Sequence, residues 1–236
     1  MQQMPPIAVL AGGLAKRLRP ITATIPKSLV EVAGRPFVAH QLELFARRGI
    51  REVVLCTGFL GEQLQDYVGD GSRFGLHARF ISDGDVLRGT GGAVRNALPM
   101  LGEEFFVTYG DSYLDIAYAD VIGAFRASGA PALMTVFKNE GRWDTSNIEF
   151  EGGRIHVYDK RRRTPRMQHI DYGLLVMTPQ AFAGCDQSGA FDLADLLNGM
   201  ATAGSLAGFE VHTRFYEIGS FAGLAELEAR LGRGPA

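Results

Sequence analysis

The stretch Leu10-Ala-Gly-Gly-Leu-Ala-Lys-Arg-Leu-Arg-Pro20 follows directly on a short apolar run, Pro6-Ile-Ala-Val-Leu-Ala11. The apolar run predicts a buried strand that ends at a pair of glycines. Gly12 and Gly13 allow the backbone to turn sharply and to approach a ligand closely. Three cations then follow: Lys16, Arg17 and Arg19. A glycine turn that carries N–H donors and positive charge after a buried strand is typical of phosphate binding in α/β proteins.

The spacing of the glycines excludes two common phosphate-binding motifs. A Walker loop requires GxxxxGK[ST], and no such string follows Gly12. A dinucleotide fingerprint requires GxGxxG, but Leu14 and Arg17 stand at its third and sixth places. A basic surface turn is the simplest alternative for the stretch alone. A second cationic stretch, Ile25-Pro-Lys-Ser-Leu29, favours the phosphate-binding interpretation.

Together, GGLAKRLRP and IPKSL resemble the signature loop of the sugar-1-phosphate nucleotidyltransferases (nucleotide-sugar pyrophosphorylases), usually written GGxGTRLxPLT…PKP. Ala15 stands where the family usually has glycine, and Lys16 where it often has Thr or Ser. The resemblance continues through LRGTGGA at 87–93, YGD at 109–111 and EIGS at 217–220, so it covers almost the whole chain. It implies a transfer in which an NTP and a sugar 1-phosphate give an NDP-sugar and pyrophosphate, assisted by Mg²⁺.

The composition fits one globular α/β domain. The chain has 236 residues, of which 46% are apolar, so it can bury a substantial core. A formal net charge of −2 gives no general affinity for polyanions, so a phosphate site must come from local clustering. Cys56 and Cys185 are expected to be reduced thiols. With no signal peptide or membrane-length apolar run apparent, we expect a cytoplasmic protein without a membrane partner.

Strands alternate with helices in the first half of the chain, which predicts a doubly wound sheet with ligands at the strand ends. The expected strands are 6–11, 52–57, 76–81 and 104–109, and the expected helices are 37–48, 61–68 and 90–101. The second half is richer in strands: 132–138, 147–150, 154–158, 173–177 and 209–215. Two helices are expected there, one that begins after its N-cap Asp192 and a later one that ends at Leu231. We predict a Rossmann-like, doubly wound mixed sheet with a small β-rich sugar-binding portion. It forms a single domain, 1–236, with a nucleotide-binding half at about 1–115 and a sugar-phosphate-binding half at 116–236.

The implied reaction needs cations more than a base. A phosphate monoester has a second pKa of about 6, so the attacking oxygen is already ionised. Fixed cations and a carboxylate-held Mg²⁺ stabilise the charge that grows on the phosphates. The resemblance places Arg17 on the NTP phosphates, Lys27 between both phosphates and Asp111 on Mg²⁺. Solvated surface cations and a turn-forming aspartate are the simpler alternatives.

The resemblance also assigns the second metal ligand and the nucleotide site. Glu217 occupies the place of an aspartate in the family's D-x-G, and a salt-bridging strand-end glutamate is its alternative. LRGTGGA resembles the segment that meets the nucleobase and ribose, and a helix-opening glycine turn without a ligand is its alternative. The predicted nucleotide-binding residues are Leu10, Ala11, Gly12, Gly13, Arg17, Gly89, Thr90 and Gly91.

The sugar side departs further from the family pattern. Asp159 and Lys160 stand at the place of the family's E-K, Asn147 where many relatives have glycine, and Asp171 where many have asparagine. The predicted sugar-phosphate-binding residues are Lys27, Asn147, Asp159, Lys160, Asp171 and Gly173. Hairpin turns are the alternative for these positions. Trp143 is expected either to stack near this pocket or to pack in the core.

The substrate interpretation remains open between several sugars. GRPF at 34–37 and GTGGAVRNAL at 89–98 resemble heptose-1-phosphate guanylyltransferases, whereas GDGSRFGL at 69–76 resembles N-acetylmuramate-1-phosphate uridylyltransferases. The leading prediction is D-glycero-D-manno-heptose 1-phosphate with GTP; N-acetylmuramate, mannose or glucose 1-phosphate with UTP, GTP or CTP is the alternative. A homodimer is also expected.

Two other function classes compete with an enzyme. One is a non-catalytic nucleotide-sugar binding or regulatory subunit. The other is a nucleic-acid module formed by the basic run Lys160–Arg166. That run lacks interleaved aromatics in a slightly acidic chain, which favours a solvated loop or a flexible lid and no nucleic-acid partner.

Overall fold

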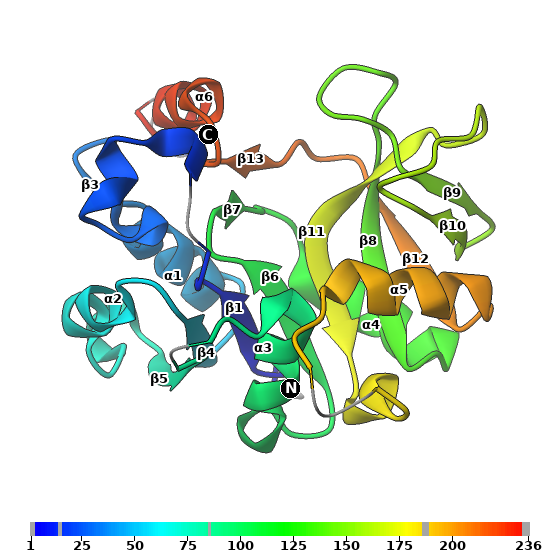
Figure 1. Cartoon of the computed structure of the whole chain (residues 1–236), viewed down its shortest axis with the longest axis horizontal. Coiled ribbons are helices and arrows are strands. Elements are labelled where there is room, and N and C mark those ends of the chain that lie inside the picture. The colour runs from blue at the N-terminus through cyan, green and yellow to red at the C-terminus, as the bar shows by residue number, and fades with distance from the viewer. Residues whose placement is uncertain (1–2, 14–15, 85, 186–188, 233–236) are drawn as a thin grey trace.

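The computed structural model describes residues 3–13, 16–84, 86–185 and 189–232. A nine-stranded mixed sheet, in the order β5-β4-β1-β6-β11-β8-β12-β10-β9, runs through the molecule with helices on both faces (Figure 1). Its strands are β1 Ile7–Leu10, β4 Glu52–Thr57, β5 His77–Ser82, β6 Phe105–Tyr109, β8 Ala132–Lys138, β9 Ile148–Glu151, β10 Arg154–Tyr158, β11 His169–Met177 and β12 Leu206–Val211. The α-helices are α1 Phe37–Arg47, α2 Gly61–Val68, α3 Gly89–Ala97, α4 Tyr118–Ser128, α5 Leu193–Thr202 and α6 Phe221–Leu231.

The first half of the sheet is parallel. β1 pairs with β4 on one side and β6 on the other, and β5 extends the sheet beyond β4. The chain moves outward from β1 to β5 and then returns through α3 to β6, so the strand order reverses beside β1. In such sheets a crevice opens at the carboxyl ends of the strands where the order reverses. The glycine turn after β1 and the YGD stretch after β6 both lie at this edge.

The second half is mainly antiparallel, which confirms the predicted mixed α/β fold. β11 runs antiparallel to both β6 and β8, and β12 is parallel to β8. The β9–β10 hairpin lies at the far end of the sheet. One continuous sheet therefore joins the two halves of the chain; their assignment to nucleotide and sugar stays a prediction.

Three sequence-based assignments need correction. The predicted strand 209–215 lies at 206–211, because the Phe150 ring fills the space over Gly208 and lets a glycine continue the strand. The strand predicted at 173–177 begins earlier, at His169, before a register irregularity around Gly173. The helix α4 was not predicted, although Tyr118, Val121, Ile122 and Phe125 bury one helical face.

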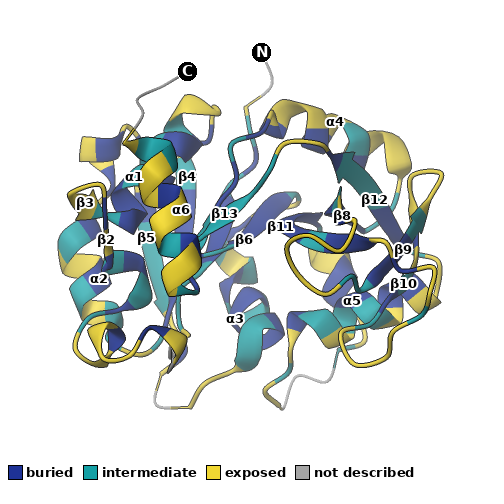
Figure 2. Cartoon of the chain, turned by 90° about the horizontal axis from the view of Figure 1, so that it is seen from above, coloured by how far each residue is buried: buried dark blue, intermediate teal, exposed yellow. Residues whose placement is uncertain are grey.

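Two hydrophobic cores cover the two faces of the sheet. Side chains of α1, α2 and α4 pack on one face, and those of α3 and α5 on the other. Seen from above, the buried strands lie between helices whose outer surfaces are exposed (Figure 2). The apolar runs of the central strands are continuous because both faces are covered. None of the helices in the described ranges is long and apolar enough to span a bilayer.

A two-stranded sheet joins the C-terminal part of the chain to the segment that follows β6. β7, Ser112–Tyr113, pairs antiparallel with β13, Tyr216–Glu217. A third core then joins α6 to α1 and to the segment after the glycine turn. Its members are Leu18, Val30, Val32, Phe37, Leu44, Tyr113, Ile218 and Leu227. This packing places Glu217 at the edge of the sheet where β1 and β6 end.

Candidate active site

The glycine turn after β1 is held by its neighbours. The Ala11 N–H donates to the Cys56 carbonyl at 2.9 Å, and the Gly110 N–H donates to the Leu10 carbonyl at 2.9 Å. A Cβ on Gly12 would lie 3.2 Å from the Gly58 nitrogen, whereas a Cβ on Gly13 would meet nothing within 4 Å. A side chain at Gly12 would therefore crowd the Gly58 backbone, whereas Gly13 leaves space for a ligand. Leu14, Ala15 and the Lys16 side chain lie outside the described structure, including the departure from the family at Ala15.

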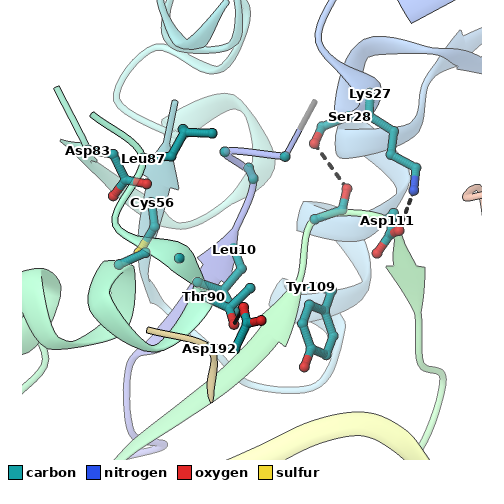
Figure 3. A pocket seen from close by; sticks show the side chains of 16 residues that line it. Leu10, Lys27, Ser28, Cys56, Asp83, Leu87, Thr90, Tyr109, Asp111 and Asp192 are labelled. Carbon is teal, nitrogen blue, oxygen red and sulfur yellow. Dashed lines mark hydrogen bonds and ion pairs between the residues drawn. The ribbon is translucent and has the colours of Figure 1, made fainter. Parts of the chain in front are cut away.

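Lys27 and Asp111 form an ion pair at the head of this turn (Figure 3). Their side chains are 17% and 27% exposed. Lys27 begins a 3₁₀ turn, Lys27–Leu29, that is fastened to the end of β6 because the buried Ser28 hydroxyl donates to the Gly110 carbonyl at 3.0 Å. The ion pair thus joins the second cationic stretch to the YGD stretch.

Glu217 lies beside Asp111 because β13 pairs with β7. The Ile218 N–H donates to the Asp111 carbonyl at 2.9 Å. The Glu217 carboxylate accepts from the Gly219 N–H and, at 2.8 Å, from the Ser220 hydroxyl. A Cβ on Gly219 would lie 2.9 Å from the Arg17 guanidinium and 3.1 Å from the Lys27 ammonium. Three distant parts of the chain therefore meet here: the segment after the glycine turn with Arg17 and Lys27, the turn after β6 with Asp111, and the C-terminal segment with Glu217.

The residues present fit a magnesium ion. Asp111 and Glu217 offer hard carboxylate oxygens from neighbouring strands, and Mg²⁺ commonly binds one or two carboxylates together with substrate phosphates and water. Within the described ranges, no cluster of three or more His, Cys, Asp or Glu side chains forms a closed cage.

A cavity of about 290 Å³ opens next to the glycine turn. Six of the predicted nucleotide-binding residues line it: Leu10, Ala11, Gly12, Gly13, Gly89 and Thr90. Lys27 and Asp111 stand at one end of it, whereas Gly91 and Arg17 are not part of its wall. The sequence analysis missed Cys56, Asp83, Tyr109 and Asp192, which also line it. Cys56, Asp83 and Tyr109 stand in or directly after strands whose carboxyl ends meet here. Their places at the ends of the predicted strands could have identified them from the sequence.

The GTGG segment is shaped by Phe191. The N–H groups of Gly91 and Gly92 donate to the Phe191 carbonyl at 3.0 and 3.3 Å. A Cβ on Gly91 would collide with the Phe191 ring. The Thr90 hydroxyl donates to the Asp192 carboxylate at 3.2 Å and accepts from the Leu193 N–H at 2.8 Å. Asp192 occupies the predicted N-cap position of α5, but the side chain that meets a free N–H of the helix is Thr90.

A larger cavity of about 760 Å³ lies on the other side of Asp111. Four predicted sugar-site residues line it: Asn147, Lys160, Asp171 and Gly173. Arg17 and Glu217 also line it, so this cavity adjoins the cationic centre. Asp159 lies instead in a neighbouring hollow, where its carboxylate accepts from the N–H groups of Arg161 and Arg162 at 2.7 and 2.9 Å. These backbone bonds lower the pKa of Asp159 and give it the role of a turn residue.

Asp171 stands at the wall of the larger cavity. Its carboxylate accepts from the Gly173 N–H at 3.0 Å and from the Tyr158 hydroxyl at 3.3 Å. Burial raises the pKa of Asp171, and the nearby Lys160 ammonium acts in the opposite direction. A Gly173 φ of +102° places the bend of β11 here.

An aromatic and cationic stack lines the same cavity. The Arg214 guanidinium carbon lies 3.7 Å from the centroid of the Trp143 ring and 5.0 Å from that of Tyr216. Glu226 accepts from Arg214 at 2.5 Å. Trp143 therefore stacks at the cavity, one of its two predicted places. Arg214 and Glu226 were not predicted, because segments far apart in sequence build the stack.

Comparison with known proteins identifies the chain. The model of the nucleotidyl transferase family matches residues 7–147. The chain belongs to that family. It is 28% identical over 228 residues to N-acetylmuramate alpha-1-phosphate uridylyltransferase of Neisseria meningitidis, covering 95% of this chain and 97% of that one. It is 34% identical over 175 residues to glucose-1-phosphate thymidylyltransferase of Streptomyces antibioticus. That alignment covers 72% of this chain and 49% of the relative, which is the longer protein.

Solved structures share the fold of this nucleotidyltransferase. HddC from Yersinia pseudotuberculosis superposes with a TM-score of 0.81 at 20% identity, covering 97% of this chain and all of the other. Inositol-1-phosphate CTP transferase from T. maritima gives 0.76 at 22% identity, covering 100% and 99%. Together with the sequence relatives, they confirm the predicted family, fold and enzyme class, a sugar-1-phosphate nucleotidyltransferase. Because the names of the relatives refer to several different sugars, the particular sugar and nucleotide stay predictions. The homodimer and the cytoplasmic location also stay predictions.

The basic run of this nucleotidyltransferase is tied to the β-rich end. Arg166 pairs with Glu149 at 2.5 Å, and the Thr164 hydroxyl donates to the same buried carboxylate. Arg161 lies 3.4 Å from Asp195 on α5. The Thr164 hydroxyl and the Arg166 guanidinium lower the pKa of Glu149. They attach the C-terminal end of the run to β9, whereas the Arg161–Asp195 pair is exposed and contributes little.

Proposed function

We propose that Arg17, Lys27, Asp111 and Glu217 form the centre at which a sugar 1-phosphate attacks the α-phosphorus of an NTP. A phosphate oxygen of the sugar forms the new P–O bond, the bond to the β-phosphate breaks, and pyrophosphate leaves with its electron pair. The observation that carries this proposal is the Lys27–Asp111 ion pair, because it lies between the two cavities and next to both Glu217 and Arg17.

The cations supply what the reaction needs. The attacking oxygen requires no general base because its pKa of about 6 leaves it ionised at neutral pH. Arg17 can meet two phosphate oxygens through its planar fork, and Lys27 acts as a compact charge between the two phosphate groups. Asp111 and Glu217 would hold Mg²⁺, which neutralises phosphate charge when bound. The chain's own part is to hold two polyanions in line.

For the substrates we propose GTP and the 1-phosphate of a sugar that carries no other charged group, with D-glycero-D-manno-heptose 1-phosphate as the leading candidate. The support comes from charge in the larger cavity. Arg214 is paired with Glu226, and Arg142 with Glu140 at 2.7 Å. Cations that already carry a carboxylate partner favour a ligand with many hydroxyl groups over one with an additional negative charge.

N-acetylmuramate 1-phosphate with UTP is the second candidate. The observation that favours it is the Neisseria meningitidis relative, which aligns with this chain nearly from end to end. This sugar carries a carboxylate, so it would have to compete with Glu226 for Arg214. Mannose and glucose 1-phosphate, with UTP, GTP or CTP, remain within the same reaction class.

A pyrophosphate-release matrix tests these proposals. Each NTP is paired with heptose, mannose, glucose and N-acetylmuramate 1-phosphate, with and without Mg²⁺. We expect Mg²⁺-dependent release with GTP and a neutral sugar. Release only with UTP and N-acetylmuramate 1-phosphate would select the second candidate. Nucleotide binding without release from any pairing would contradict the catalytic proposal and favour a regulatory subunit.

A further inference from the structure

Asp83 is a buried carboxylate in the nucleotide cavity. It stands directly after β5 and is 9% exposed, and its backbone N–H donates to the Thr57 carbonyl at 2.9 Å. Its carboxylate accepts from the Arg88 N–H at 3.5 Å, which is long for a hydrogen bond. Throughout the described ranges, no side chain donates to it. Because this single long hydrogen bond uses little of the acceptor capacity of the carboxylate, most of that capacity is left for a ligand.

The other acidic groups of this cavity are engaged. Among the described residues that line it, Asp111 pairs with Lys27, and Asp192 accepts from the Thr90 hydroxyl. Figure 3 shows Asp83 across the glycine turn from the Lys27–Asp111 pair. A nucleotide whose phosphates contact Lys27 would therefore direct its base toward Asp83.

The surroundings of Asp83 suit a flat ring. Leu10, Cys56, Leu87 and Ala93 line the same cavity with mostly apolar atoms. Burial raises the pKa of the Cys56 thiol to about 12, with the Asp83 charge adding to the effect, so this neighbour is a neutral thiol at physiological pH. Asp83 is thus one strong acceptor in an apolar slot, the usual construction of a selective ligand site.

We propose that Asp83 selects guanine by accepting from its N1–H and N2–H₂ groups. These two donors lie side by side, and a carboxylate accepts such a fork through both oxygens, as it does from arginine. Uracil and thymine present one N–H between two carbonyl oxygens, which would face a negative charge. Adenine and cytosine present an amino group beside a ring-nitrogen acceptor. The inference rests on the proposed function and names the nucleotide that the site takes.

Energetics favour this selection. A carboxylate enclosed by apolar groups loses hydration, and burial raises the pKa of Asp83 accordingly. Two N–H donors would offset the part of that loss that the backbone N–H and the charge of Arg88 leave uncompensated, whereas a base without them supplies no such donors. A site built around a buried polar group rejects ligands that lack its partner more strongly than an apolar pocket rejects one of the wrong size.

Base analogues test the contact atom by atom. ITP lacks only the N2 amino group of GTP, so the wild-type chain should bind it about 10-fold to 100-fold more weakly. XTP carries a carbonyl at the same place, beside the N1–H. Asp83→Asn offers one acceptor and one N–H₂ donor, which match XTP. We therefore expect Asp83→Asn to prefer XTP and the wild type to prefer GTP, in direct binding titrations and in kcat/KM.

The control is Asp66→Asn, which removes an exposed carboxylate of α2 and should leave the GTP-to-ITP ratio unchanged. Equal binding of GTP and ITP by the wild type, tighter binding of UTP, or an unchanged GTP preference in Asp83→Asn would each overturn the proposal. The wild-type ratio decides the question even if the variant does not fold. Because binding is titrated without a sugar phosphate, its outcome is separate from failure of the proposed transfer.

Discussion

The Ile218 N–H donates to the Asp111 carbonyl at 2.9 Å, joining the residue after β13 to the turn after β6. This bond belongs to the short β7–β13 ladder, in which Glu217 faces Ser112. It places a second carboxylate beside Asp111 at the point where Arg17 and Lys27 also converge. The centre thus depends on the C-terminal segment packing back over the glycine turn.

Lys27→Ala should lower turnover strongly while keeping the fold. Lys27 is the cation that contacts Asp111 and lines the cavity beside the glycine turn, so in the proposed reaction its loss removes charge stabilisation from the phosphates. Removing one such preorganised group costs about 10²-fold to 10³-fold in kcat. Steady-state pyrophosphate release measures the change, with circular dichroism as the check on folding. Lys138→Ala, at the exposed end of β8, is the control; near-normal turnover of Lys27→Ala would remove this lysine from the mechanism.

Glu217→Gln should weaken the response to magnesium. The substitution removes the charge and keeps one of the two oxygens that accept from the Gly219 N–H and the Ser220 hydroxyl; the amide N–H₂ that replaces the other oxygen can donate to the Ser220 hydroxyl. We expect a higher Mg²⁺ concentration at half-maximal turnover, whereas Glu217→Asp, which retains a carboxylate, should recover part of the affinity.

Titration of activity with Mg²⁺ and with Mn²⁺ measures this difference. Glu228→Gln, on the exposed side of α6, provides a matched loss of one carboxylate. An unchanged metal dependence in Glu217→Gln would assign Glu217 to the structure of the turn alone.

Gly91→Ala should destabilise the chain through Phe191. The new methyl group would overlap the aromatic ring, and overpacking of this kind costs about 1–3 kcal/mol. Phe191→Leu should relieve part of the cost when combined with Gly91→Ala. Urea unfolding of both single variants and of the double variant measures the coupling. Strict additivity of the two losses would show that the ring does not enforce this glycine.

Asp171→Asn should stabilise the chain near neutral pH. Burial raises the pKa of Asp171, so folding favours its protonated form. The group therefore contributes stability below the ordinary aspartate pKa of about 3.9 and loses that contribution as the pH rises through its folded-state pKa. At neutral pH the buried charge is a cost that asparagine avoids, and the advantage of the variant should shrink toward acid.

Asp159→Asn is the matched contrast, with the opposite sign. Backbone donors lower the pKa of Asp159, so its charge stabilises the folded chain above the unfolded pKa, and this contribution is lost as the pH falls through the lowered pKa. Urea unfolding from neutral pH to about pH 2, which passes below the ordinary aspartate pKa, follows both variants. A pH-independent difference between wild type and Asp171→Asn would show that the carboxylate is not strained by burial.

Local sequence patterns predicted most of the sheet and the cationic centre. A glycine pair after an apolar run predicts the end of a buried strand, and Arg17 and Lys27 follow soon after that end. Such a pattern can be recognised from the sequence because all of its members lie near one another in the chain. Asp111 was found in the same way, since it follows the buried strand β6. The shifted edges of β12 show where this reasoning fails: Gly208 looks like an interruption until the Phe150 ring that covers it is known.

The sequence by itself determined the α/β order, the glycine turn after β1 and the family, because these depend on periodicity and on short motifs. Only the tertiary structure decided which side chains share a cavity. It brought Glu217 to Asp111, packed Phe191 against Gly91, turned Asp159 away from the larger cavity and left Asp83 with unused acceptor capacity. Such relationships follow from packing between segments distant in the chain, and no local spacing encodes them.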